Sequence, residues 1–195
     1  MRQLFLFVLL AALIPGCATT PVNTMSAEER FSQAQTFTAS WHAHSKEMAL
    51  KIMDEYGPPD QIFADLLVWY NTGSWNKVAV WDTEDYNYSD ALGPATLEQT
   101  LFDPVPQAKR RALADFSDGI SVSEDGKKLS VRSNSEALVY LTFNLAHEIV
   151  QGAKGPSEAR LFYDRTYKLS LAGKSSPYMQ WLLFPAQPGD GFPQF

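Results

Sequence analysis

The segment around His147 contains the residue types of a zinc-dependent hydrolase, but their spacing is incomplete. In the His-Glu-x-x-His pattern, two histidines one helical turn apart bind zinc, and the glutamate acts as a general base. Here His147 and Glu148 are followed by Gln151 at the position of the second histidine. We therefore predict no metal site, and we interpret His147 as a helix residue that bonds a neighbour such as Asn144 or lines a cleft.

Other catalytic patterns are missing from the sequence. It contains no Gly-x-Ser-x-Gly nucleophile turn, and neither a phosphate-binding loop nor a dinucleotide fingerprint. Glu84 and Asp85 are adjacent carboxylates, and a glycosidase needs two at a set separation, but they stand in a polar segment that we interpret as a solvated loop. We expect no catalytic residue and no cofactor. Asn144 and His147 remain candidates for a small-ligand pocket between a long helix and a sheet.

The single cysteine, Cys17, follows a segment that looks like a bacterial lipoprotein signal. Eleven apolar residues, Leu4 to Ile14, come after Arg2. This run is shorter than the roughly 20 residues that span a bilayer and suits a signal-peptide core of about 7–15 residues. The string Ile14-Pro15-Gly16-Cys17 is similar to a lipobox, which implies that residues 1–16 are removed and that the Cys17 thiol, nucleophilic as the thiolate, is acylated. An ordinary secretory signal with a chance cysteine is the alternative.

The residue after this cysteine and the overall charge bear on location and partners. In lipoproteins of this class, aspartate at the second position retains the protein in the inner membrane. Residue 18 is alanine, which implies the outer membrane and a domain that faces the periplasm. The chain carries 22 acidic and 16 basic residues, a formal net charge of −6, and this balance argues against a nucleic-acid partner.

Periodicity and turn residues predict one α+β domain over residues 45–184, preceded by a flexible tether at 17–44 and followed by a tail at 185–195. The tether is rich in Thr, Ser, Ala and Gln, and we expect in it at most a short helix near 27–35. Within the domain we expect helices near 45–56, 107–116, 136–151 and 156–172, with Ser45 and either Ser133 or Asn134 as N-caps. Hairpins at 66–82 and 119–133 and a strand near 96–103 predict an antiparallel sheet packed against these helices.

Four aromatic residues crowd the first hairpin: Trp69, Tyr70, Trp75 and Trp81. The two-residue period of a strand predicts that Trp69 and Tyr70 lie on opposite faces and that Trp75 shares a face with Trp81. Both faces of the sheet would then carry large rings. If helices cover only one face, the other exposes an aromatic patch, and such patches mark binding surfaces. The alternative is that helices or the tail bury all four rings.

A family resemblance rests on five stretches: YGPPDQI (56–62), LVWYNTGSWNKVAVW (67–81), LTFNLAHEIVQG (141–152), SEARLFYDRTY (157–167) and GKSSPYMQWLLF (173–184). They are similar to a family of uncharacterised proteobacterial envelope proteins, over roughly residues 45–184. The resemblance implies one integral domain and implies no activity. Other members often have Gly-Pro-Trp after the turn asparagine, where this chain has Thr72-Gly73-Ser74-Trp75.

A second, shorter likeness concerns Gly57-Pro58-Pro59-Asp60, between a predicted helix and a predicted strand. It is similar to a unit of small outer-membrane lipoproteins that help to assemble β-barrel proteins. Proline and aspartate favour turns through their own backbone chemistry, so convergent turn chemistry explains the match equally well.

The sequence therefore favours an outer-membrane lipoprotein, anchored to the membrane by lipid, whose domain is a non-catalytic interaction or envelope-maintenance module. Its expected partner is an envelope protein or a glycan, bound through the aromatic hairpin. A small-ligand-binding lipoprotein with a pocket near His147 is the first alternative. A hydrolase that acts on an envelope polymer such as peptidoglycan is the second.

Overall fold

The computed structural model describes residues 25–84 and 95–186. Several expected features lie outside the described residues: the signal peptide, Cys17 and the first part of the tether, Asp85, and the last nine residues of the tail.

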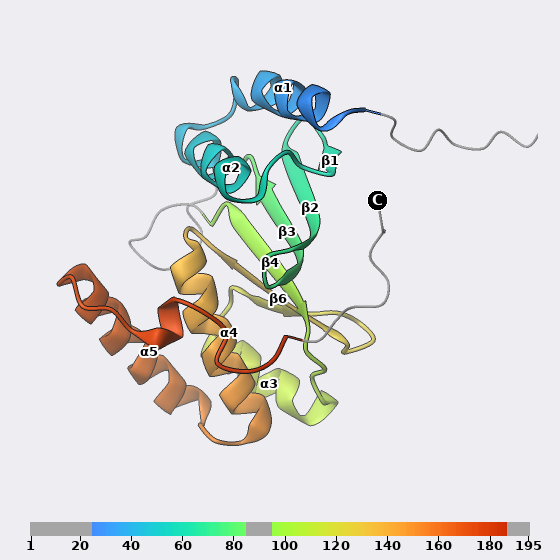
Figure 1. Cartoon of the computed structure of the whole chain (residues 1–195). Coiled ribbons are helices and arrows are strands. Elements are labelled where there is room, and N and C mark those ends of the chain that lie inside the picture. Colours follow the sequence, from blue (N-terminus) through green and yellow to red (C-terminus); the bar gives the residue numbers. More distant parts are fainter. Residues whose placement is uncertain (1–24, 85–94, 187–195) are drawn as a thin grey trace, which may run out of the picture.

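One antiparallel sheet forms the centre of the described chain (Figure 1). Its strand order is β1-β2-β3-β4-β6-β5, and every neighbouring pair is antiparallel. The strands are β1 (Gln61–Ile62), β2 (Leu66–Thr72), β3 (Trp75–Trp81), β4 (Leu97–Phe102), β5 (Ile120–Val122) and β6 (Lys128–Ser133). The predicted α+β class, with a sheet built from hairpins, is confirmed.

The helices gather on one face and at one end of this sheet (Figure 1). They are α1 (Ala27–Thr38), α2 (Ala43–Tyr56), α3 (Gln107–Phe116), α4 (Glu136–Gln151) and α5 (Pro156–Leu171), with a 3-10 turn η1 (Pro177–Met179). Helices α2 and α4 contact the sheet, α3 and α5 pack on α4, and α1 lies beside α2 and β1. None of the helices among the described residues is long and apolar enough to cross a membrane.

On the other face of the sheet the described residues form cross-strand polar pairs, and none of the described helices covers it. The Lys77 ammonium on β3 lies 2.8 Å from the Glu98 carboxylate on β4. The Thr100 and Ser130 hydroxyls are 2.8 Å apart on β4 and β6. The hydroxyl pair is directly opposite and the ion pair is diagonal in the strand register, and cross-strand pairs of both kinds stabilise an antiparallel sheet.

Helix α4 is the centre of the core because its sequence is apolar on several sides. Ten of its sixteen residues are buried. Its N-cap is Ser135, one or two residues later than predicted, and the Ser135 hydroxyl accepts the Leu138 N–H. Gly152 ends the helix with a φ of 80°, a left-handed conformation that glycine adopts without steric penalty.

The predicted tether is wrong from Ser26 onward, because the folded unit begins there, and the short helix expected near 27–35 is the longer α1. Ser26 and Glu29 form a capping box that starts α1. Ala34 and Trp41 are buried, and the Trp41 indole N–H donates to the Ala64 carbonyl at 2.7 Å. Helical periodicity in this polar segment is weak, since only two of the α1 residues are buried, and the sequence signal was correspondingly faint.

The start of α2 also differs from the prediction. Ser45 is buried inside the helix, and the N-cap position belongs to His42. The Ser45 hydroxyl accepts the Thr83 N–H at 3.2 Å, so this serine joins α2 to the end of β3 and does not cap a helix.

We predict that Trp41→Ala lowers the free energy of unfolding by about 3–5 kcal/mol, the usual range for removal of a buried tryptophan. The measurement is urea unfolding followed by circular dichroism. Ser40→Ala, at the exposed neighbouring residue, serves as the control and should change stability little. Equal stabilities of the two variants would mean that this segment is a tether after all.

Candidate functional site

The predicted aromatic surface of the first hairpin does not form, and this expectation is corrected. Trp69 and Trp75 are each only 2 % exposed. The Trp69 indole N–H donates to the Gly57 carbonyl at 2.9 Å. Tyr70 and Trp81 are partly exposed, and the Arg132 guanidinium lies 5.6 Å from the centre of the Trp81 ring. Two rings therefore belong to the core, and the four do not compose one contact surface.

Trp75 also lies on a different side from the one that alternation predicts. Its ring packs against Tyr140 and Phe143 of α4, at 4.9 and 5.4 Å between ring centres. These ring contacts place Trp75 on the face covered by α4, which the two-residue period counted along β3 from Trp81 does not predict.

Trp75 of this hairpin bonds a buried carboxylate that the sequence does not single out. Glu136, the first residue of α4, is 8 % exposed, and its Oε1 atom accepts three hydrogen bonds. The donors are the Tyr56 hydroxyl at 2.7 Å, the Trp75 indole N–H at 2.7 Å and the Gln99 amide at 2.6 Å. They come from α2, β3 and β4, so one oxygen joins four elements.

Burial and the Glu136 carboxylate change the pKa values of two neighbouring side chains, Tyr56 and Glu55. Burial, and then the bond to Glu136, raise the pKa of the Tyr56 hydroxyl well above its ordinary value. Burial followed by repulsion from Glu136 raises the pKa of Glu55. A negative charge in the first turn of α4 is also favoured by the helix dipole. The three bonds to Oε1 hold α2, β3 and β4 to the start of α4, so the arrangement is suited to holding the fold.

We predict that Glu136→Ala lowers the free energy of unfolding by about 3–5 kcal/mol, because three buried donors would lose their acceptor. Glu136→Gln should lose less, since an amide oxygen can still accept. Glu158→Ala is the matched control, because Glu158 is also in the first turn of its helix but is exposed. Chemical denaturation measures all three, and a loss in Glu136→Ala no larger than in the control would contradict the assignment.

The predicted ligand pocket at Asn144 and His147 is filled by the chain itself, which corrects that expectation. Asn144 is 2 % exposed. Its amide N–H groups donate to the carbonyls of Tyr178 and Trp181, at 3.1 and 2.9 Å, and its Oδ1 accepts the Leu183 N–H at 2.7 Å. All of these bonds go to main-chain atoms, so Asn144 holds residues 177–183 against α4.

His147 contacts the same segment. Its ring stacks on Phe184, with 4.0 Å between ring centres and an angle of 6°. Its Nδ1 lies 3.2 Å from Oδ2 of Asp103, which is 8 % exposed. An aspartate that orients a histidine is one part of a general base, but no hydroxyl or thiol among the described residues is bonded to His147. The pair is therefore best explained as support for the C-terminal segment.

Glu148 also binds the segment that Asn144 and His147 hold against α4. Its Oε1 accepts the Tyr178 hydroxyl at 2.7 Å, and its Oε2 lies 3.3 Å from the Lys154 ammonium. Burial, and then the bond to Glu148, raise the pKa of Tyr178 to about 12. Sequence reasoning named Asn144 and His147 but missed Asp103 and Tyr178. The signal that was available is the row of polar residues at 144, 147 and 148 on one side of an otherwise apolar helix.

A cavity of about 230 Å³ lies elsewhere, between α2 and the start of α4. Neither Asn144 nor His147 contributes to it; its lining is His44, Glu47, Met48, Lys51, Thr96, Asn134 and Ser135. Over residues 25–84 and 95–186, no three His, Cys, Asp or Glu side chains are grouped so as to hold a metal ion.

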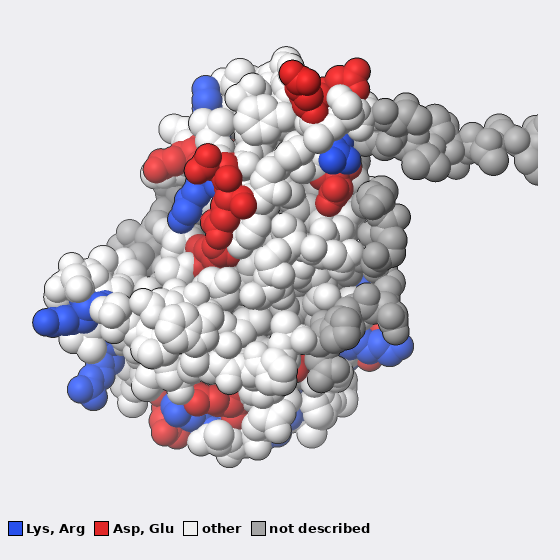
Figure 2. Space-filling model, in the orientation of Figure 1, with Lys and Arg blue, Asp and Glu red and all other residues white. Residues whose placement is uncertain are grey.

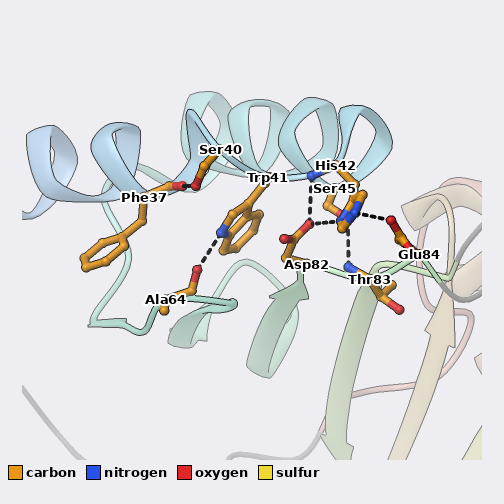
Figure 3. A network of polar contacts seen from close by, with 9 residues as sticks. All are labelled: Phe37, Ser40, Trp41, His42, Ser45, Ala64, Asp82, Thr83 and Glu84. Atoms are coloured by element: carbon orange, nitrogen blue, oxygen red, sulfur yellow. Dashed lines mark hydrogen bonds and ion pairs between the residues drawn. The ribbon is translucent and has the colours of Figure 1, made fainter.

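A third polar cluster joins the start of α2 to the end of β3 (Figure 3). Asp82 Oδ1 accepts the His42 backbone N–H at 2.9 Å and lies 2.9 Å from the His42 Nδ1 atom. His42 Nε2 lies 2.7 Å from Glu84 Oε1. The bonds to Asp82, and then to Glu84, raise the pKa of His42. The two carboxylates therefore stabilise the protonated form of the His42 ring more than the neutral form.

This cluster predicts a pH dependence. Because the pKa of His42 is higher in the folded chain, its contribution is complete below the unfolded value of about 6.5 and is lost as the pH rises through the folded pKa. The stability difference between the natural chain and His42→Ala should therefore shrink from mildly acidic to mildly alkaline pH. Denaturation at a series of pH values measures it.

His44→Ala provides the comparison, because it removes another exposed histidine that forms no ion pair among the described residues. A pH-independent difference for His42→Ala, or an equal dependence for His44→Ala, would contradict the prediction. The Asp82 bond to the backbone N–H survives both substitutions.

Comparison with protein-family profiles, with curated proteins and with solved structures finds no match. The functional assignment therefore rests on the residues and on the geometry.

Proposed function

We propose that this chain is an outer-membrane lipoprotein, anchored through Cys17, whose folded part faces the periplasm as a non-catalytic interaction or envelope-maintenance module. The observation that carries the proposal is the position of the only cysteine, directly after Gly16 and eleven apolar residues. A lipoprotein cysteine of this class carries three acyl chains. Two or more chains attach a protein stably to a membrane, whereas a single chain binds only marginally.

The start of the folded unit limits how far this domain can stand from the membrane. Ser26 caps α1, so only residues 18–25 separate the cysteine from the fold. Even a fully extended chain of this length spans no more than about 30 Å. The proposed module therefore works close to the membrane surface, and not at the end of a long tether.

The roles of the polar side chains support the non-catalytic part of the proposal. Asn144 and His147 bind the C-terminal segment. Glu136 binds donors from three other elements. Each of these groups has a structural duty that a catalytic cycle would disturb. The partner surface must also lie outside the buried part of the hairpin, because Trp69 and Trp75 are in the core.

We predict that Cys17→Ala abolishes incorporation of labelled palmitate and releases the domain from the outer-membrane fraction. The measurement is metabolic labelling followed by fractionation of cells that produce the full chain. Ala18→Asp is the matched variant: it should keep the label and move the protein to the inner membrane, because aspartate at this position retains lipoproteins of this class.

Labelling of Cys17→Ala to the level of the natural chain would overturn the lipid anchor. Fractionation of the natural, labelled chain with the inner membrane would keep the anchor and overturn the outer-membrane assignment.

A further inference from the structure

Helix α5 exposes large apolar side chains on the side that faces away from the molecule. Leu161 and Leu171 are 71 % and 70 % exposed, more than any other large apolar residue among those described. Ala159 and Thr166 are the buried residues of α5 and lie on the opposite side of the helix. The helix forms one edge of the described molecule (Figure 1), and no other described helix or strand covers its outer side.

Two charged residues lie between these leucines on the same side. Asp164 and Lys168 are exposed, and neither takes part in an ion pair within the part of the chain that the structure describes. Positions 161, 164, 168 and 171 follow the spacing i, i+3, i+7, i+10, which forms a single stripe along a helix. Basic side chains project from this edge of the molecule (Figure 2).

We propose that this stripe, Leu161-Asp164-Lys168-Leu171, binds the same stripe of a second copy of the chain, with the two α5 helices antiparallel. The order of residue types is self-complementary. In an antiparallel pair centred on residue 166, Leu161 of each copy faces the partner's Leu171, and Asp164 faces the partner's Lys168. The pair has twofold symmetry, so each contact occurs twice, as in the commonest class of protein dimer.

The stripe fits this partner better than it fits a lipid surface. Helices that lie on membranes have a continuous apolar face and a polar face rich in Lys and Arg. Here a carboxylate stands in the middle of the stripe, where anionic lipid would repel it. Against a second copy the same carboxylate meets an ammonium, and the leucines at both ends are removed from water. Two facing helices make a contact below the standard interface size of about 1,600 Å², so we infer a weak, reversible dimer.

Charge exchange provides the test. Two differently tagged copies of the full chain are produced in the same cells, the membranes are dissolved in mild detergent, and one tag is used to capture the other copy. Asp164→Lys in both copies, or Lys168→Asp in both copies, should reduce capture about tenfold, which is about 1.4 kcal/mol in binding free energy. The double exchange Asp164→Lys with Lys168→Asp should restore capture.

A mixed experiment distinguishes pairing from a folding defect. A copy with Asp164→Lys should capture a copy with Lys168→Asp, although neither captures itself. Leu161→Ser should weaken capture, whereas Leu50→Ser, at an exposed leucine of α2, should not. All these residues are exposed, and unfolding curves check that the variants are folded.

Cysteine cross-linking tests the direction of the pair. A copy with Leu161→Cys should form a disulfide with a copy carrying Leu171→Cys, but not with another Leu161→Cys copy, because residues 161 of the two chains would lie about 15 Å apart along the axis. Failure of natural copies to capture each other, or capture by each charge-reversed variant at the level of the natural chain, would overturn the proposal. Cross-linking of two Leu161→Cys copies alone would overturn the antiparallel arrangement.

Discussion

The acceptance of three hydrogen bonds by one buried oxygen of Glu136 is the constraint on which the rest of this fold depends. A buried carboxylate is costly unless its bonds are complete, and its donors come from α2, β3 and β4. The position of α4 is therefore tied to that of the first hairpin and to the C-terminus of α2. The same requirement explains why the Trp75 ring lies in the core beneath α4, although its place in the strand suggests the other face.

Helix α4 has a second polar side that holds the C-terminal segment by a different principle. Asn144 bonds only main-chain atoms of residues 178–183, while Phe184 and Tyr178 add a ring contact with His147 and a bond to Glu148. A buried amide needs partners for its donors and its acceptor, and an extended segment supplies carbonyls and N–H groups at regular intervals. Residues 178–184 are thus a structural part of the domain, and they occupy the place where a ligand pocket could have been.

The elements with strong local signals were predictable from the sequence, whereas the contacts that depend on tertiary packing were not. Clear local patterns come from the turn at Gly73, from Pro156 in the first turn of α5 and from the apolar residues of α4. The two hairpins and helices α3, α4 and α5 accordingly lie close to the predicted ranges. The sequence predicts a tether with at most a short helix where α1 lies, because a contact that fixes this segment is distant: the indole of Trp41, just after α1, donates to the Ala64 carbonyl, 23 residues away. The sequence predicts a surface for Trp69 and Trp75, because no sequence rule shows that the Gly57 carbonyl and the Glu136 carboxylate accept hydrogen bonds from their indoles. Asn144 and His147 were recognised as unusual in an apolar helix, but their partners are 34 to 44 residues away.

The proposed anchor and the proposed pairing surface constrain each other through geometry. Helix α1, which follows the anchor segment, and helix α5 lie at opposite ends of the described molecule (Figure 1). A lipid on Cys17 would keep the α1 end within about 30 Å of the membrane through residues 18–25, and α5 would then be carried on the part of the domain that is farther from α1. Two copies held in this way share one surface and a similar height, which raises their effective concentration and removes much of the orientational search. A helix contact too small to maintain a dimer in solution can therefore be sufficient between anchored copies, and pairing of this kind would depend on the density of the protein in the membrane.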